Sequence, residues 1–142
     1  MSGCVLRVHG ADLDLETLLS TAPIPPLRTW VRGEPRGRSG ALGLQPASGA
    51  TFAVGRASAE DLPAQIEEAL HFLQMHRGWL PALATLAGVE TRVVDMATQV
   101  PPTLWASRVF PAALLGLLGA FNIDLCVSLY PAQDDDTDAA PA

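Results

Sequence analysis

Alternation of apolar and polar residues near both ends of the chain constrains the fold more than any other feature. Residues 123–130, "IDLCVSLY", have apolar residues at every second position, and so do residues 4–9, "CVLRVH". A period of two is typical of strands that bury only one face. The covered face would carry Cys4, Leu6, Val8, Ile123, Leu125, Val127 and Leu129. The open face would carry Arg7, His9, Asp124, Ser128 and Tyr130.

Helical patterns separate the strands. Asp12 or Asp14 can cap a short helix that carries the apolar face Leu15, Leu18 and Leu19. Ser58 with Asp61 predicts the start of a longer helix, because short polar side chains cap the first free amides. The apolar face of this helix is Leu62, Ile66, Leu70 and Leu73, and Gly78 and Pro81 predict a kink or a break after it. Residues 109–121 form a third helical segment, and Asn122 suits the left-handed geometry that ends a helix.

Further strands are expected at residues 28–32, 51–54 and 89–96. The order β-α-β-β-α-β-α-β predicts an α+β fold with one mixed or antiparallel sheet of about five strands and helices packed on one face. Its first six elements follow a ferredoxin-like order, extended by a further helix and strand. We expect a single domain over residues 1–131 and a disordered acidic tail over residues 132–142.

The most unusual stretch is "LRTWVRGEPRGRSG", residues 27–40. It holds four of the nine basic residues, all of which are arginine, in a chain whose formal net charge is −6. Residues 28–32 and 51–54 are expected to form a hairpin, and the Gly- and Pro-rich residues between them should form no regular element. Arg28, Trp30 and Arg32 would then share one strand face, with the indole between two guanidinium groups.

Three interpretations of this stretch remain open: anion binding, a partner surface, and a solvated hairpin tip. In the last of these, Trp30 anchors the hairpin to the core and the arginines cover its rim. In the first two, the arginines bind carboxylates or phosphates. The candidate binding residues are Arg28, Trp30, Arg32, Arg36 and Arg38.

Other chemistry has little support in the sequence. The histidines His9, His71 and His76 lack metal-site spacing, and no nucleophile motif or phosphate loop is present. We therefore expect a protein that is not an enzyme and that needs no cofactor or metal. An acidic chain of pI near 4.8 is also a poor general binder of nucleic acid.

Location and thiol state follow from similar patterns. No charged leader is visible, and the apolar segment 109–121 is shorter than the ~20 residues that span a bilayer, so no membrane association and a cytoplasmic location are expected. Cys4 and Cys126 both fall in predicted strands. We expect both to be buried, unpaired thiols.

The run "LRTWVRGEPR", preceded by "HGADLDLETLL" and followed by "SAEDLPAQIEEALHFLQ", resembles the bacterial family called domain of unknown function 4279. Trp30, Arg32, Gly33 and Pro35 carry this resemblance, together with the closing "IDLCVSLYP"; the loop "SGALGLQPASG" departs from it. The resemblance spans most of residues 3–131. It implies an α+β fold without an established activity, and it points to small bacterial accessory proteins, including immunity-type proteins that bind another protein.

The leading hypothesis is a protein-interaction or immunity-type module whose contact surface includes the hairpin of residues 28–54. Its partner would be another protein of acidic character. The alternative is a domain that binds a small ligand or anion, with Arg28, Trp30 and Arg32 in a pocket and with weak hydrolytic activity as one variant. A deep pocket beside Trp30 would favour the alternative, and a flat or protruding hairpin the first. Because open sheet edges are commonly protected by symmetric pairing, we also expect a homodimer.

Overall fold

A computed structural model describes residues 3–37, 40–102 and 105–132. The elements follow the order β1 (Cys4–Gly10), α1 (Leu15–Thr21), β2 (Arg28–Trp30), β3 (Ser48–Ala53), α2 (Leu62–Met75), a 3-10 helix η1 (Pro81–Thr85), β4 (Thr91–Val100), α3 (Ala112–Ala120) and β5 (Asp124–Pro131). This confirms the α+β class and the mixed five-stranded sheet.

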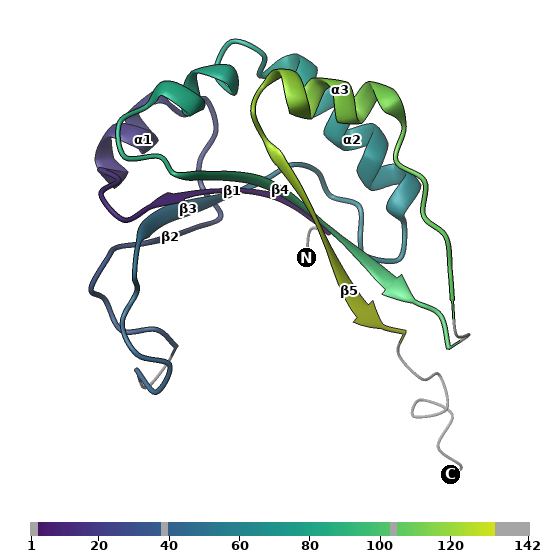
Figure 1. Ribbon diagram of the computed structural model, residues 1–142, viewed down its shortest axis with the longest axis horizontal. Helices are drawn as coiled ribbons and strands as arrows, with labels where there is room; N and C mark the ends of the chain where they lie inside the picture. The colour runs from purple at the N-terminus through teal and green to yellow at the C-terminus, as the bar shows by residue number, and fades with distance from the viewer. Residues whose placement is uncertain (1–2, 38–39, 103–104, 133–142) are drawn as a thin grey trace.

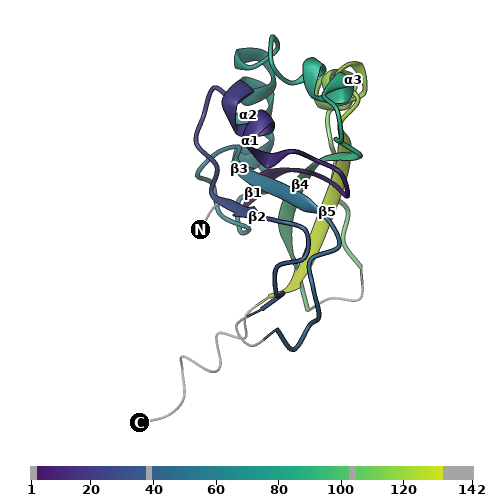
Figure 2. The same cartoon turned by 90° about the vertical axis from the view of Figure 1, so that its left-hand side faces the viewer.

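The strands form one sheet in the order β2-β3-β1-β4-β5, with β2 and β5 at its edges. All neighbouring pairs are antiparallel except β4 and β5, which run parallel and are joined through α3. The three α-helices lie on one side of the arched sheet, and none of the described residues forms a helix over the other side (Figures 1 and 2). A ferredoxin-like relationship of the first six elements stays a prediction.

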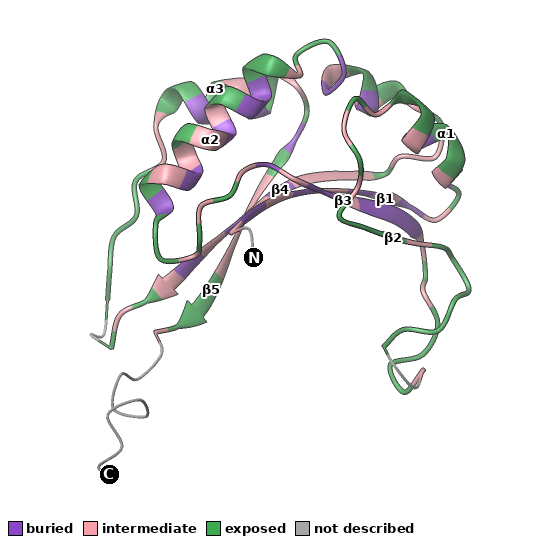
Figure 3. Ribbon diagram, turned by 180° about the vertical axis from the view of Figure 1, so that it is seen from behind, coloured by how far each residue is buried: buried purple, intermediate pink, exposed green. Residues whose placement is uncertain are grey.

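The core lies between the helices and the covered face of the sheet (Figure 3). Burial along β1 alternates strictly, so that its core side chains are fully buried while the intervening ones are half-buried. The strands contribute Cys4, Leu6, Val8, Phe52, Val94 and Met96, and the helices contribute Leu18, Ala69, Phe72, Leu73, Leu114 and Leu118. The alternation in "CVLRVH" therefore predicted both the strand and its core face correctly.

Local caps explain where the helices begin and end. The side chain of Asp14, not of Asp12, accepts hydrogen bonds from two backbone amides at the start of α1. Asp61 caps α2 in the same way and accepts from the amide of Ala64 at 3.1 Å. The helix breaks after Met75 and the chain continues into η1, while Asn122 adopts φ 55° after α3, as expected.

The predicted burial of β5 is only partly correct. Its core-facing positions lose burial along the strand, from buried Ile123 just before it to Leu129, which is 65% exposed. The reason is geometric, because the distal half of this edge strand extends beyond the helix layer (Figure 1). The expectation that both cysteines are buried is wrong for Cys126. This thiol is only partly buried, because the β4–β5 register places it on the open face beside Asp95.

We expect Cys126 to react with a thiol reagent in the native protein and Cys4 to react only after unfolding. Burial, followed by the nearby carboxylates of Asp95 and Glu68, raises the pKa of the Cys4 thiol to about 12, so its reactive thiolate is scarce at neutral pH. Reagent kinetics on Cys4→Ser and Cys126→Ser variants, with and without denaturant, assign each rate. Equal native rates for the two thiols would contradict this placement.

Candidate functional site

The open face of the sheet holds a hollow of about 580 Å³ over β2, β3 and β1. Three arginines line it: Arg7 from β1, Arg28 from β2 and Arg36 from the hairpin that follows β2. His9 and Trp30 line it as well, and the described residues contribute no carboxylate to its lining. The hollow is therefore an electropositive region on an acidic protein.

Strand register explains how these residues meet. Arg28 pairs with Thr51 of β3, which in turn pairs with Arg7 of β1. Because directly paired residues point to the same face, the two guanidinium groups share the open side of the sheet. Trp30 is related to His9 in the same way through Gly49.

Trp30 belongs to the open face and not to the core. Its indole is half-buried and lies over Gly49, where an added Cβ would come within 2.5 Å of the ring. The guanidinium carbon of Arg28 stands 5.8 Å from the ring centroid, within the range of a cation–π contact. The indole therefore holds Arg28 at the rim of the hollow and is not a core anchor for the hairpin.

Residues 31–37 and 40–47 form no regular strand, as expected, but the two arms contact each other. Pro35 forms a bridge with Leu44, and the amide of Arg36 donates to the carbonyl of Gly43 at 2.8 Å. Gly33 and Gly43 adopt φ of 88° and 86°, a region that favours glycine, which lets the two arms curl without strain. This extension carries Arg36 to the hollow and hangs below the arched sheet (Figure 1).

The grouping of Arg32 with Arg28 and Trp30 is wrong. Strand β2 ends at Trp30, and Arg32 lies in the following turn. Its guanidinium contacts Asp12 Oδ1 at 3.3 Å, and it does not line the hollow. Both side chains of this pair are largely exposed, so it contributes little to stability. Arg38 lies outside the described residues.

Arg7 connects the arginine hollow to a second, larger one. Its guanidinium forms an ion pair of 2.6 Å with Asp95 Oδ2, and Ser128 donates to Asp95 Oδ1 at 2.7 Å. These residues line a hollow of about 790 Å³ over β1, β4 and β5, together with Glu60 and Tyr130. The sequence predicted that Arg7, Ser128 and Tyr130 share the open face, but it gave no signal that Arg7 joins Arg28 and Arg36.

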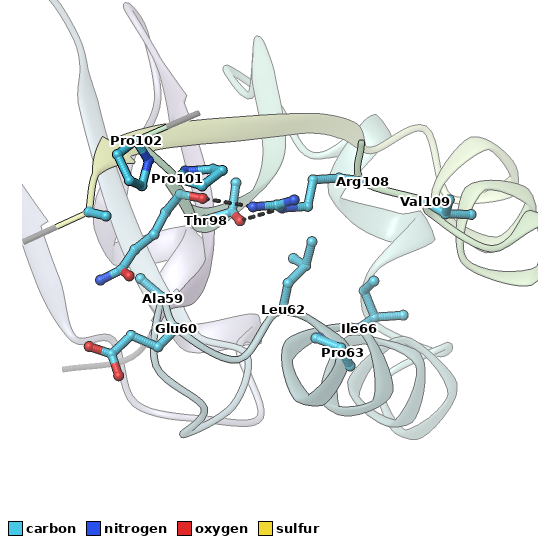
Figure 4. Close-up of a pocket in the computed structure, with 12 residues that line it drawn as sticks. Ala59, Glu60, Leu62, Pro63, Ile66, Thr98, Pro101, Pro102, Arg108 and Val109 are labelled. Atoms are coloured by element: carbon cyan, nitrogen blue, oxygen red, sulfur yellow. Dashed lines mark hydrogen bonds between the residues drawn. The ribbon is translucent and has the colours of Figure 1, made fainter. Parts of the chain in front are cut away.

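A third hollow, of about 570 Å³, lies between the start of α2, the end of β4 and the segment before α3 (Figure 4). Its arginine, Arg108, has a structural role, because its guanidinium binds β4. Nε donates to the hydroxyl of Thr98 at 3.2 Å, and Nη2 donates to the carbonyl of Gln99 at 2.9 Å. This hollow holds none of the predicted binding residues.

Residues 3–37, 40–102 and 105–132 contain no group of three or more His, Cys, Asp or Glu side chains that could hold a metal ion. None of the helices in those ranges is long and apolar enough to cross a membrane. Comparison with family profiles, curated proteins and solved structures found no match to this chain.

The packing of Trp30 over Gly49 can be tested with a matched pair of variants. Gly49→Ala should lower the free energy of unfolding by about 1–3 kcal/mol, because the methyl group would overpack the indole and the backbone of Val8. Gly116→Ala in α3 is the control. Its Cβ would meet no atom within 4 Å, and replacing a helical glycine should add about 0.5–1 kcal/mol. Urea unfolding of both variants provides the measurement, and equal effects would contradict the packing described.

Proposed function

We propose that this protein is a non-enzymatic binding module that recognises an acidic region of another protein through the arginine hollow. The observation that carries the proposal is the pair Arg28 and Arg36. Among the described residues, no carboxylate lies within ion-pairing distance of either guanidinium, and both side chains face a hollow without acidic lining. Like charges gathered without compensation favour an anionic ligand over a purely structural role.

The proposal favours a protein over a small molecule because the hollow lies on an exposed sheet face beside a protruding hairpin. Planar guanidinium groups bind carboxylates in a bidentate manner, which suits Asp and Glu side chains on a partner. An immunity-type role is the version that the resemblance to domain of unknown function 4279 favours. Membership of that family, a cytoplasmic location and a lack of nucleic-acid binding belong to the same proposal.

A small-anion site is the second candidate function. A hollow of about 580 Å³ beside Trp30 is within the size range of ligand pockets, and this is the feature expected to favour the small-ligand alternative. The side chains of Arg28 and Arg36 that line it are exposed, so the hollow is also open to a large partner. Catalysis has less support, because the hydroxyl of Ser128 donates to an aspartate that is already paired with Arg7.

The test uses a fluorescein-labelled peptide rich in glutamate and measures its binding by anisotropy. Arg28→Gln combined with Arg36→Gln should weaken binding about tenfold or more, since each charge-assisted contact is worth about 1 kcal/mol or more. The double variant should also flatten the salt dependence. Arg77→Gln, at an exposed arginine after α2, is the control and should bind like the wild type.

Two outcomes decide between the candidates. Equal affinities of the double variant and the Arg77 control would contradict a binding role for the hollow. Displacement of the peptide by inorganic phosphate or citrate at micromolar concentration would favour the small-anion site, whereas no displacement below millimolar concentrations supports the protein partner.

Self-association is a separate part of the proposal. Within the described part of the chain no strand pairs with the outer edge of β2 or of β5, and Leu129 is 65% exposed on the longer edge. We propose a homodimer and expect light scattering at high micromolar concentration to give twice the chain mass. Leu129→Arg should reduce this to the monomer mass, since a charge on an edge strand opposes pairing. A wild-type monomer at that concentration contradicts the proposal.

A further inference from the structure

We propose that the two hollows of the open face form one binding groove, which holds an extended acidic segment of the partner with a basic residue toward its far end. This inference rests on the proposed function and adds the shape and charge pattern of the ligand. Its central observation is that Arg7 lines both hollows.

The groove crosses the whole sheet. The first hollow lies over β2, β3 and β1, and the second over β1, β4 and β5, on the same uncovered face. Strands are about 4.8 Å apart, so five of them span about 19 Å. The groove also runs along β1, because His9 lines the first hollow and Gly3 lines the second. An extended chain rises about 3.3 Å per residue, so roughly six to eight residues fit the groove.

Charge differs between the two ends of this groove. Arg28 and Arg36 stand at the β2 end without an acidic partner among the described residues. In the middle, Arg7 and Asp95 neutralise each other at 2.6 Å. At the far end, Glu60 is exposed and lines the second hollow, and the described residues hold no cation paired with it.

The far end also offers apolar and hydrogen-bonding surface. Val5, Ala97 and Pro131 line the second hollow, and Tyr130, which is 53% exposed, stands at its border. Amphipathic tyrosine rings are common at protein interfaces because they combine contact area with a polar group. A segment that places carboxylates at Arg28 and Arg36 and a guanidinium near Glu60 and Tyr130 complements the groove at both ends.

The test compares three labelled peptides of equal length on a Gly-Ser-Thr background. The first carries two adjacent glutamates at one end, the second adds an arginine about six residues away, and the third places that arginine two residues away. Anisotropy should show that the second peptide binds wild type about fivefold more tightly than the other two. Both chain orientations of the second peptide are measured, because the groove does not fix the direction.

Variants of the protein test whether the higher affinity of the second peptide comes from Glu60. Glu60→Gln should lower the ratio of the second peptide's affinity to the first peptide's affinity to about one. Glu67→Gln, at an exposed glutamate of α2, is the control and should keep the advantage. If the first peptide binds through Arg28 and Arg36 but the spaced arginine adds nothing, or Glu60→Gln leaves its advantage intact, the groove is wrong while the proposed function stands. If the first peptide does not depend on the arginines, the proposed function itself is wrong.

Discussion

Strand β1 is the element on which the rest of the structure depends. It lies between β3 and β4 in the sheet, and its side chains alternate between full burial and partial exposure. One set, Cys4, Leu6 and Val8, packs under the helices. The other set includes Arg7 and His9, which belong to the open face. A single strand therefore builds the core and the candidate site, and a shift of one residue in its register would exchange the two faces.

The helices cover only one face of the sheet, so the open face must be stable in contact with water. The ion pair of Arg7 with Asp95 meets this requirement. Asp95 keeps 13% of its side-chain exposure and Arg7 keeps 33%, and Ser128 completes the carboxylate's hydrogen bonding. Removing one partner of such a half-buried pair costs more than the pair contributes, because the other charge is left without compensation. Arg7 is therefore mainly a structural residue at the boundary of the two hollows, and the proposed binding of an acidic segment depends on Arg28 and Arg36.

Helix caps depend on residues close together in the chain and were predictable from the sequence. Contacts between segments that pair across the hairpin were not. Asp61 and Asn122 act within a single turn of chain, so their patterns were sufficient. Arg36 reaches the hollow only because Pro35 bridges Leu44 and curls the hairpin. The composition of that segment, rich in glycine and proline, gave no indication of this bridge. The prediction for Arg32 was wrong because the strand at residues 28–32 was predicted two residues too long, which assigned Arg32 to the wrong face.

The distribution of arginine contacts over the molecule gives the strongest argument about function. Arg92 donates to the carbonyl of Asn122 at 2.9 Å, and Arg108 binds the end of β4, so both hold adjacent segments together. Arg32 and Arg7 each meet an aspartate. Arg28 is positioned by the Trp30 ring, whereas only the backbone amide of Arg36 is held, by the carbonyl of Gly43. Neither guanidinium has a carboxylate partner among the described residues. A guanidinium that is held in place without charge compensation, as in Arg28, contributes most to binding a carboxylate, because less side-chain freedom is lost when the ligand arrives.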